Sequence, residues 1–201
     1  MRFDVPFYVQ GYNECGPVTL LMILEFLGEK HEKEKIKQLI DSESTGATMT
    51  IGLANAAAKL GFKTEFFSIC LGFNPRYFEL DYYRKVTDGA QSMEAKINRL
   101  RAECIKNGVI MHEKKLTLEE IQKKINTDCM AFILLDWSKV QNVQRYIGHF
   151  VPIVGFDEQH VYIHQPGPLD ATPHQALPRD IFEIARKAQG TDEDIVFIHR
   201  K

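Results

Sequence analysis

The spacing of apolar residues changes character along this chain of 201 residues. In the first 125 residues they mostly recur with a helical period, and later they form short continuous runs of strand length. The pattern predicts helices at 15–27, 32–41, 50–60, 91–106, 116–125 and 180–187. It predicts strands at 62–68, 130–136, 149–156, 160–164 and 195–199. Because most helices precede most strands, we expect an α+β fold, with an N-terminal helical part packed on a C-terminal antiparallel sheet.

An aromatic-rich segment at 71–90 interrupts this pattern. It holds five aromatic side chains within eleven positions: Phe73, Tyr77, Phe78, Tyr82 and Tyr83. They could line a cleft or form a lid, or they could be core residues packed on the helix at 91–106. No repeat or linker divides the chain, so we expect a single domain over residues 1–201.

Composition narrows the classes of partner. The formal net charge is −2, so a nucleic-acid partner is not expected. No apolar run approaches the roughly 20 residues that span a bilayer, and residues 1–6 lack an apolar signal core. We therefore expect no membrane partner and a cytoplasmic protein. Composition does not predict the oligomeric state.

The four cysteines, at positions 15, 70, 104 and 129, form no Cys-x-x-Cys pair. We therefore expect reduced thiols and no zinc site or other cofactor. His160 and His164 are four residues apart but lie in an expected strand, without the helical spacing that makes such pairs useful ligands.

Cys15 stands directly before the first apolar helical run, with Gln10 a short step upstream. A helix N-terminus carries partial positive charge and free backbone N–H groups, which favour a thiolate nucleophile. The same groups can bind an oxyanion, and the Gln10 amide can add a donor. The alternative is that Cys15 is a small buried apolar residue.

A thiol nucleophile needs a base, and His149 is the candidate. It follows Gly148 at the start of an expected strand, where a pocket can form. Gln165 ends the strand expected to pair with it, and its carbonyl oxygen can accept from the second imidazole nitrogen. Asp136 and Asp157 are alternative orienting residues, although Asp157 also suits a turn.

Two motifs carry a resemblance to a known family. They are Gln10 with Glu14-Cys15-Gly16-Pro17 before a helix, and Gly148-His149-Phe150 followed by a strand ending in His164-Gln165-Pro166-Gly167. Together they resemble the papain-like cysteine peptidases related to bacteriocin-leader, or double-glycine, peptidases, in a stand-alone form. The resemblance covers 5–28 and 147–168. It implies Cys15 as nucleophile, His149 as general base and acid, and Gln10 as oxyanion donor.

Two positions depart from that family. Gln165 stands where the family usually has Asp and sometimes Asn, and Gln10 lies one residue closer to the cysteine than is usual. No Gly-x-x-x-x-Gly-Lys sequence is present, so an exporter is not expected.

The resulting hypothesis is a cysteine peptidase or amidohydrolase that cleaves a peptide or amide bond through an acyl-enzyme. One alternative keeps the Cys–His chemistry but transfers the acyl group to an amine or thiol, as an acyl- or peptidyl-transferase. The other is a catalytically degenerate peptide-binding domain, which the neutral Gln165 favours.

Overall fold

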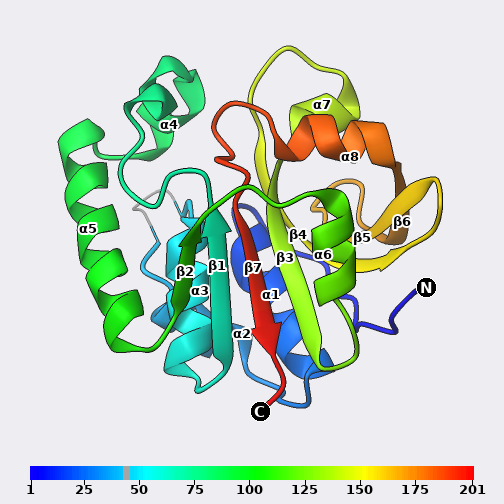
Figure 1. The fold of residues 1–201 in the computed structure, drawn as a ribbon. Helices are drawn as coiled ribbons and strands as arrows, with labels where there is room; N and C mark the ends of the chain where they lie inside the picture. The colour runs from blue at the N-terminus through cyan, green and yellow to red at the C-terminus, as the bar shows by residue number, and fades with distance from the viewer. Residues whose placement is uncertain (43–45) are drawn as a thin grey trace.

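The computed structural model describes residues 1–42 and 46–201 and contains one seven-stranded sheet (Figure 1). Its strand order is β2-β1-β7-β3-β4-β5-β6. All neighbouring strands are antiparallel except β1 and β2, which are parallel. The strands are β1 (Lys63–Ser68), β2 (Ile110–Glu113), β3 (Cys129–Asp136), β4 (Gly148–Phe156), β5 (His160–Gln165), β6 (Thr172–Pro178) and β7 (Ile195–His199).

Helices cover both faces of the sheet (Figure 1). On one face, α1 packs on β3 and β4, and α3 packs on β1 and β7; on the other, α8 packs on β3, β5 and β6. The helical elements are α1 (Cys15–Phe26), α2 (Lys33–Leu39), α3 (Thr50–Lys59), the short 3-10 helix η1 (Pro75–Glu79), α4 (Asp81–Val86), α5 (Ala90–Lys106), α6 (Leu118–Lys124), α7 (Trp137–Gln141) and α8 (Arg179–Arg186). In the described part of the chain, no helix is both long and apolar enough to cross a bilayer.

The α+β fold is confirmed, and every helix and strand expected from the pattern is present. Helix α6 begins with a capping box, since the side chains of Thr117 and Glu120 each accept from the other's backbone N–H. The pattern missed β2 and β6, which form the two edges of the sheet and bury few side chains, so they lack a clear alternation.

The C-terminal strands that carry His149 form the expected antiparallel sheet, and one other pair of neighbouring strands, β1 and β2, is parallel. The chain leaves β1, passes through η1, α4 and α5, and returns as β2 in the same direction. A crossover of this kind joins parallel strands, whereas the hairpin connection expected elsewhere joins antiparallel ones. The aromatic segment at 71–90 is part of this crossover.

The N-terminal segment runs beside the sheet and leads to the candidate site. Phe3 N–H donates to the Val154 carbonyl at 2.8 Å, and Phe156 N–H donates to the Met1 carbonyl at 2.8 Å. Farther along, Gln10 N–H donates to the Pro166 carbonyl at 2.8 Å, just beyond the end of β5. The segment is therefore fixed at both ends, which places Gln10 next to the last residues of β5.

Gly155 makes this close approach of the N-terminal segment to β4 feasible. A Cβ there would lie 2.6 Å from the Met1 carbonyl oxygen and 2.9 Å from the Arg2 Cα. We expect Gly155→Ala to lower the free energy of unfolding by about 1–3 kcal/mol, because backbone must move. Urea unfolding measures this. Gly72→Ala is the control, since a Cβ there meets nothing within 4 Å; equal stability of the two variants would contradict the account.

Candidate functional site

The candidate residues meet where several strands begin or end. Because the strands are antiparallel, the ends of β3 and β5 lie on the same side of the sheet as the starts of β4 and β7. His149 is the second residue of β4 and Gln165 is the last of β5. Cys15 is the first residue of α1, which packs on β4. All three side chains, with Gln10, line one cleft of about 830 Å³.

Cys15 begins α1 as expected, and two opposing effects act on the pKa of its thiol. Burial raises the pKa of the thiol, although backbone N–H groups of Phe150 and Gly16 donate to it and lower the pKa in part. The loss of solvation is thus the larger effect, and the donors around the sulfur are neutral. Burial therefore outweighs the helix-end effects that favour a thiolate, and Cys15 is a neutral thiol at pH 7.

His149 and Gln165 form a buried hydrogen-bonded pair. The His149 Nε2 lies 2.8 Å from the Gln165 Oε1, and the two residues are 6% and 3% exposed. Gly167 N–H donates to the same Oε1 at 3.0 Å. Since a backbone N–H can only donate, the oxygen of the amide must face both groups. His149 therefore carries its proton on Nε2, which leaves Nδ1 with a free lone pair.

The surroundings of His149 keep the ring neutral. Burial lowers its pKa to about 4, and the hydrogen bond to Gln165 opposes this only in part. The Trp137 ring packs against it, with centroids 5.1 Å apart. At neutral pH, His149 is thus an uncharged base, and the site holds a neutral thiol and a neutral imidazole.

The two alternative orienting residues have other partners. Asp136 Oδ1 accepts from the backbone N–H groups of Ser138 at 3.1 Å and Ile147 at 3.0 Å, so it caps α7 and fixes the following loop. Asp157 accepts from the backbone in the turn between β4 and β5. That turn lies at the far end of β4 from His149, roughly 25 Å away along a strand of this length. Neither carboxylate contacts His149.

Gln10 is 7% exposed, and its buried Oε1 has no hydrogen-bond partner within residues 1–42 and 46–201. An unpartnered buried polar atom is uncommon in proteins and is typical of a group kept for a ligand. The side chain lines the same cleft as Cys15. The structure thus places Gln10 at the site, and its role as an oxyanion donor stays a prediction.

The aromatic segment divides between core and cleft. Tyr77 packs with Met93 and Ile97 of α5 in a small buried cluster. Tyr82 of α4 instead lines the cleft, and its pKa is raised to about 12 by burial and by the neighbouring Cys15. The segment thus contributes Tyr77 to the core and Tyr82 to the cleft wall.

Sequence reasoning missed Trp137 as a neighbour of the catalytic candidates, and it offered Tyr82 only as one of five aromatic residues that could line a cleft. Trp137 follows β3 directly, and Tyr82 stands in the crossover, more than sixty positions from Cys15. No local sequence pattern links such residues to the site, because only the tertiary fold brings them near Cys15 and His149. In the described part of the chain, no group of three or more His, Cys, Asp or Glu side chains is arranged to hold a metal ion.

Solved structures with this fold include three peptidases. A C39-like peptidase from Bacillus anthracis is 15% identical with a TM-score of 0.60, covering 98% of this chain and 96% of the other. A double-glycine-motif protease from an AMS/PCAT transporter, solved with its leader peptide, is 16% identical with a TM-score of 0.56, covering 98% and 94%. The peptidase domain of the Streptococcus transporter ComA is 13% identical with a TM-score of 0.55, covering 98% of each chain. These likenesses show that the chain has the fold of the double-glycine peptidases.

Sequence comparison gives a different family description. The sequence profile described as guanylylate cyclase matches residues 5–198. Guanylyl cyclase 1 of Arabidopsis thaliana is 24% identical over 216 residues, covering 98% of this chain and 76% of the plant protein. The match to the profile spans nearly the whole domain and includes all four candidate residues. The chain therefore belongs to the guanylylate cyclase family and has the fold of the double-glycine leader peptidases.

Proposed function

We propose that this chain is a cysteine peptidase or amidohydrolase that cleaves a peptide or amide bond at Cys15. The observation that carries the proposal is the buried His149–Gln165 hydrogen bond beside Cys15, at the wall of an open cleft. It presents an unprotonated Nδ1 as base, which is the group that a neutral thiol requires. The peptidase-like fold is consistent with this chemistry.

The reaction begins with the neutral pair. The Cys15 thiol gives its proton to Nδ1 of His149 as the sulfur attacks the carbonyl carbon of the substrate. The oxyanion is bound by the Cys15 backbone N–H and the Gln10 amide. The imidazolium then protonates the leaving amine as the C–N bond breaks, which leaves a thioester on Cys15. Water attacks the thioester with Nδ1 as base, releases the acid and restores the thiol.

Gln165 determines whether a thiolate exists before the substrate binds or forms only as the sulfur attacks. Its oxygen orients the ring through Nε2–H, but it carries no charge to stabilise an imidazolium. The imidazolium therefore forms only as the sulfur attacks, and the thiolate does not exist beforehand. This is general-base catalysis of the kind that serine enzymes use, with a thiol in place of the hydroxyl.

A second candidate function comes from the family description, which is that of a guanylyl cyclase. Cyclisation of GTP requires neutralisation of the triphosphate, and Lys85 and Arg145 both line the cleft. Incubation of the protein with GTP and Mg²⁺ or Mn²⁺, followed by mass spectrometry for cyclic GMP, tests it. Cyclic GMP formed equally by wild type and Cys15→Ala would favour the cyclase and would assign no role in it to the thiol.

Removal of the nucleophile or the base is the first test of the peptidase proposal. Cys15→Ala and His149→Ala should each lower the turnover of a fluorogenic peptide-coumarylamide library by at least about 1,000-fold, because the residues act as a unit. Cys129→Ala is the control, since Cys129 is a buried thiol outside the cleft. Wild-type turnover by Cys15→Ala would rule the mechanism out.

An added amine acceptor separates the hydrolase from a transferase. A transferase would form the amide of the added amine in place of the free acid.

The neutral thiol predicts how Cys15 reacts with iodoacetamide. The thiolate is the reactive form, so below its raised pKa the labelling rate should increase about tenfold per pH unit. Labelling at pH 6 should be slow compared with that of a cysteine in an unstructured peptide. Peptide mapping after timed labelling gives the rate at Cys15. Fast labelling that hardly changes between pH 6 and 8 would instead indicate a preformed ion pair.

Substitution of Gln165 by Glu tests the orienting residue. A carboxylate opposite Nε2–H raises the pKa of His149 and favours a thiolate–imidazolium pair. We expect Gln165→Glu to label at least tenfold faster at pH 6 than wild type. Gln165→Met, which has a similar length but accepts no strong hydrogen bond, should lose turnover without this acceleration. If Cys15 in Gln165→Glu is labelled at the wild-type rate, the side chain at position 165 does not control the charge of His149 as proposed.

A further inference from the structure

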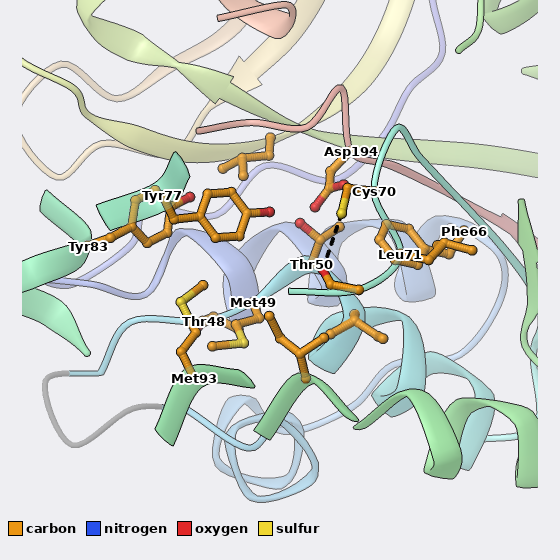
Figure 2. Close-up of a pocket in the computed structure, with 14 residues that line it drawn as sticks. Thr48, Met49, Thr50, Phe66, Cys70, Leu71, Tyr77, Tyr83, Met93 and Asp194 are labelled. Atoms are coloured by element: carbon orange, nitrogen blue, oxygen red, sulfur yellow. Dashed lines mark hydrogen bonds between the residues drawn. The ribbon is translucent and has the colours of Figure 1, made fainter. Parts of the chain in front are cut away.

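A second, inner cavity of about 60 Å³ lies near the candidate site, between the start of α3, the loop after β1 and α5. Figure 2 shows the Asp194 carboxylate close to Thr50, with Met49 and Met93 farther down the cavity. Asp194 is 7% exposed and Thr50 is 3% exposed. Within residues 1–42 and 46–201, neither Asp194 Oδ1 nor Thr50 Oγ1 has a hydrogen-bond partner. Neither atom thus makes a hydrogen bond of normal length in this largely apolar cavity, although the Thr50 hydroxyl is near enough to Asp194 to lower the pKa of the carboxyl group.

The charge of this cavity is not balanced. In the described part of the chain, the groups that act on the pKa of Asp194 are two hydroxyls and another carboxylate, with no Lys, Arg or His among them. The adjacent Asp192 is already engaged, since it accepts from Asn74 Nδ2 at 2.9 Å and from Tyr77 OH at 2.6 Å. Burial raises the pKa of Asp194 to about 7, the hydroxyl groups of Thr50 and Ser68 offset part of this, and Asp192 adds to it. The cavity therefore favours a cationic hydrogen-bond donor.

The inner cavity leads toward Cys15. A neighbouring cavity of about 70 Å³ has Cys15 in its wall and shares five wall residues with the inner one. Those shared residues are Thr48, Met49, Tyr83, Met93 and Leu134. The two cavities therefore adjoin along a mostly apolar wall.

The sheet sets the separation between the two groups. Phe150 on β4, whose N–H donates to the Cys15 thiol, pairs with Leu134 on β3. Leu134 N–H in turn donates to the Asp194 carbonyl at 3.1 Å. Asp194 thus lies two strand spacings from Phe150, or about 10 Å along the sheet. An extended side chain that begins at the reacting carbonyl has to cover a distance of this order to reach the carboxylate.

We propose that the two cavities form the specificity subsite of the Cys15 site and receive a lysine side chain on the acyl side of the cleaved bond. The inference rests on the proposed function. The leaving amine must lie beside His149, which lines the outer cleft and neither of these cavities, so the acyl half occupies them. Met49, Met93 and Leu134 contact the methylene stem, and Asp194 and Thr50 accept from the ammonium.

A compact ammonium suits the inner cavity better than a guanidinium. It is a point charge with three donors on a four-carbon stem, whereas the guanidinium is a wide planar fork. Asp194 Oδ1 and Thr50 Oγ1 supply two of the acceptors. A side chain of the same length without the amine would leave both atoms unpartnered, so it should be rejected.

Turnover and binding test the subsite separately. Coumarylamide peptides with lysine, norleucine, arginine or glutamate before the cleaved bond should show at least a tenfold preference in kcat/KM for lysine over norleucine. Asp194→Asn should abolish this preference by lowering kcat/KM for the lysine peptide at least tenfold. Asp180→Asn, which changes an exposed carboxylate on α8, should keep the preference.

Binding needs no catalysis, so it separates the two proposals. By calorimetry, Cys15→Ala should bind N-acetyl-lysine methylamide at least tenfold more tightly than the norleucine analogue, and Cys15→Ala with Asp194→Asn should bind both alike. Selective binding without turnover of any peptide would overturn the proposed function and support the subsite. Equal affinities in Cys15→Ala, or lysine preference that survives Asp194→Asn, would overturn the subsite.

A folding control accompanies these variants. The pKa of Asp194 is higher in the folded chain than in an unfolded one, so its ionisation destabilises the fold as pH rises through 7. Cys70, Tyr77 and Tyr83, the other titratable groups in the cavity wall, also have pKa values raised by burial and stay neutral there. Asp194→Asn should therefore melt at or above the wild-type temperature at pH 8. A large drop in that temperature would mean that the carboxylate serves the fold, which would overturn the subsite.

Discussion

The hydrogen bond between His149 Nε2 and Gln165 Oε1 is the interaction on which the site depends. It joins β4 and β5 through their side chains, and Gly167 N–H fixes which atom of the amide takes part. One neutral acceptor thereby sets the tautomer and the orientation of the base, while burial keeps the base uncharged. Replacement of a carboxylate by an amide at this position changes the chemistry more than the geometry, because the ring is still held but an imidazolium gains no opposite charge.

The fold explains why the chemistry gathers where it does. Strands β3 and β5 end on the same side of the sheet where β4 and β7 begin, and α1 begins there too. Cys15 therefore stands between two regions of different character. On the His149 side the cleft is wide and contains polar groups, and on the Phe150 side the cavities are narrow and apolar with the carboxyl group of Asp194 at the inner end. An acyl half and a leaving half can be recognised separately in such an arrangement.

The sequence predicted the parts of this site that local pattern encodes. Cys15 precedes an apolar helical run, and the hairpin of two buried strands places His149 and Gln165 near each other, so short-range rules were sufficient. The charge state of Cys15 could not be predicted from sequence, because helix-end effects follow from local sequence whereas desolvation depends on the packing of the fold. Asp194 gave no signal either: in sequence it is one of three acidic residues in a loop, and only the fold buries it beside the sheet.

The protonation state of His149 tests the central claim most directly. Proton-detected ¹⁵N NMR of the imidazole, recorded on protein labelled at histidine and assigned with His149→Gln, reports each ring nitrogen separately. The account predicts a proton on Nε2, a bare Nδ1 at pH 7, and no change of this state down to pH 5, since burial lowers the pKa to about 4. A proton on Nδ1 in place of Nε2, or an imidazolium at pH 7, would contradict it.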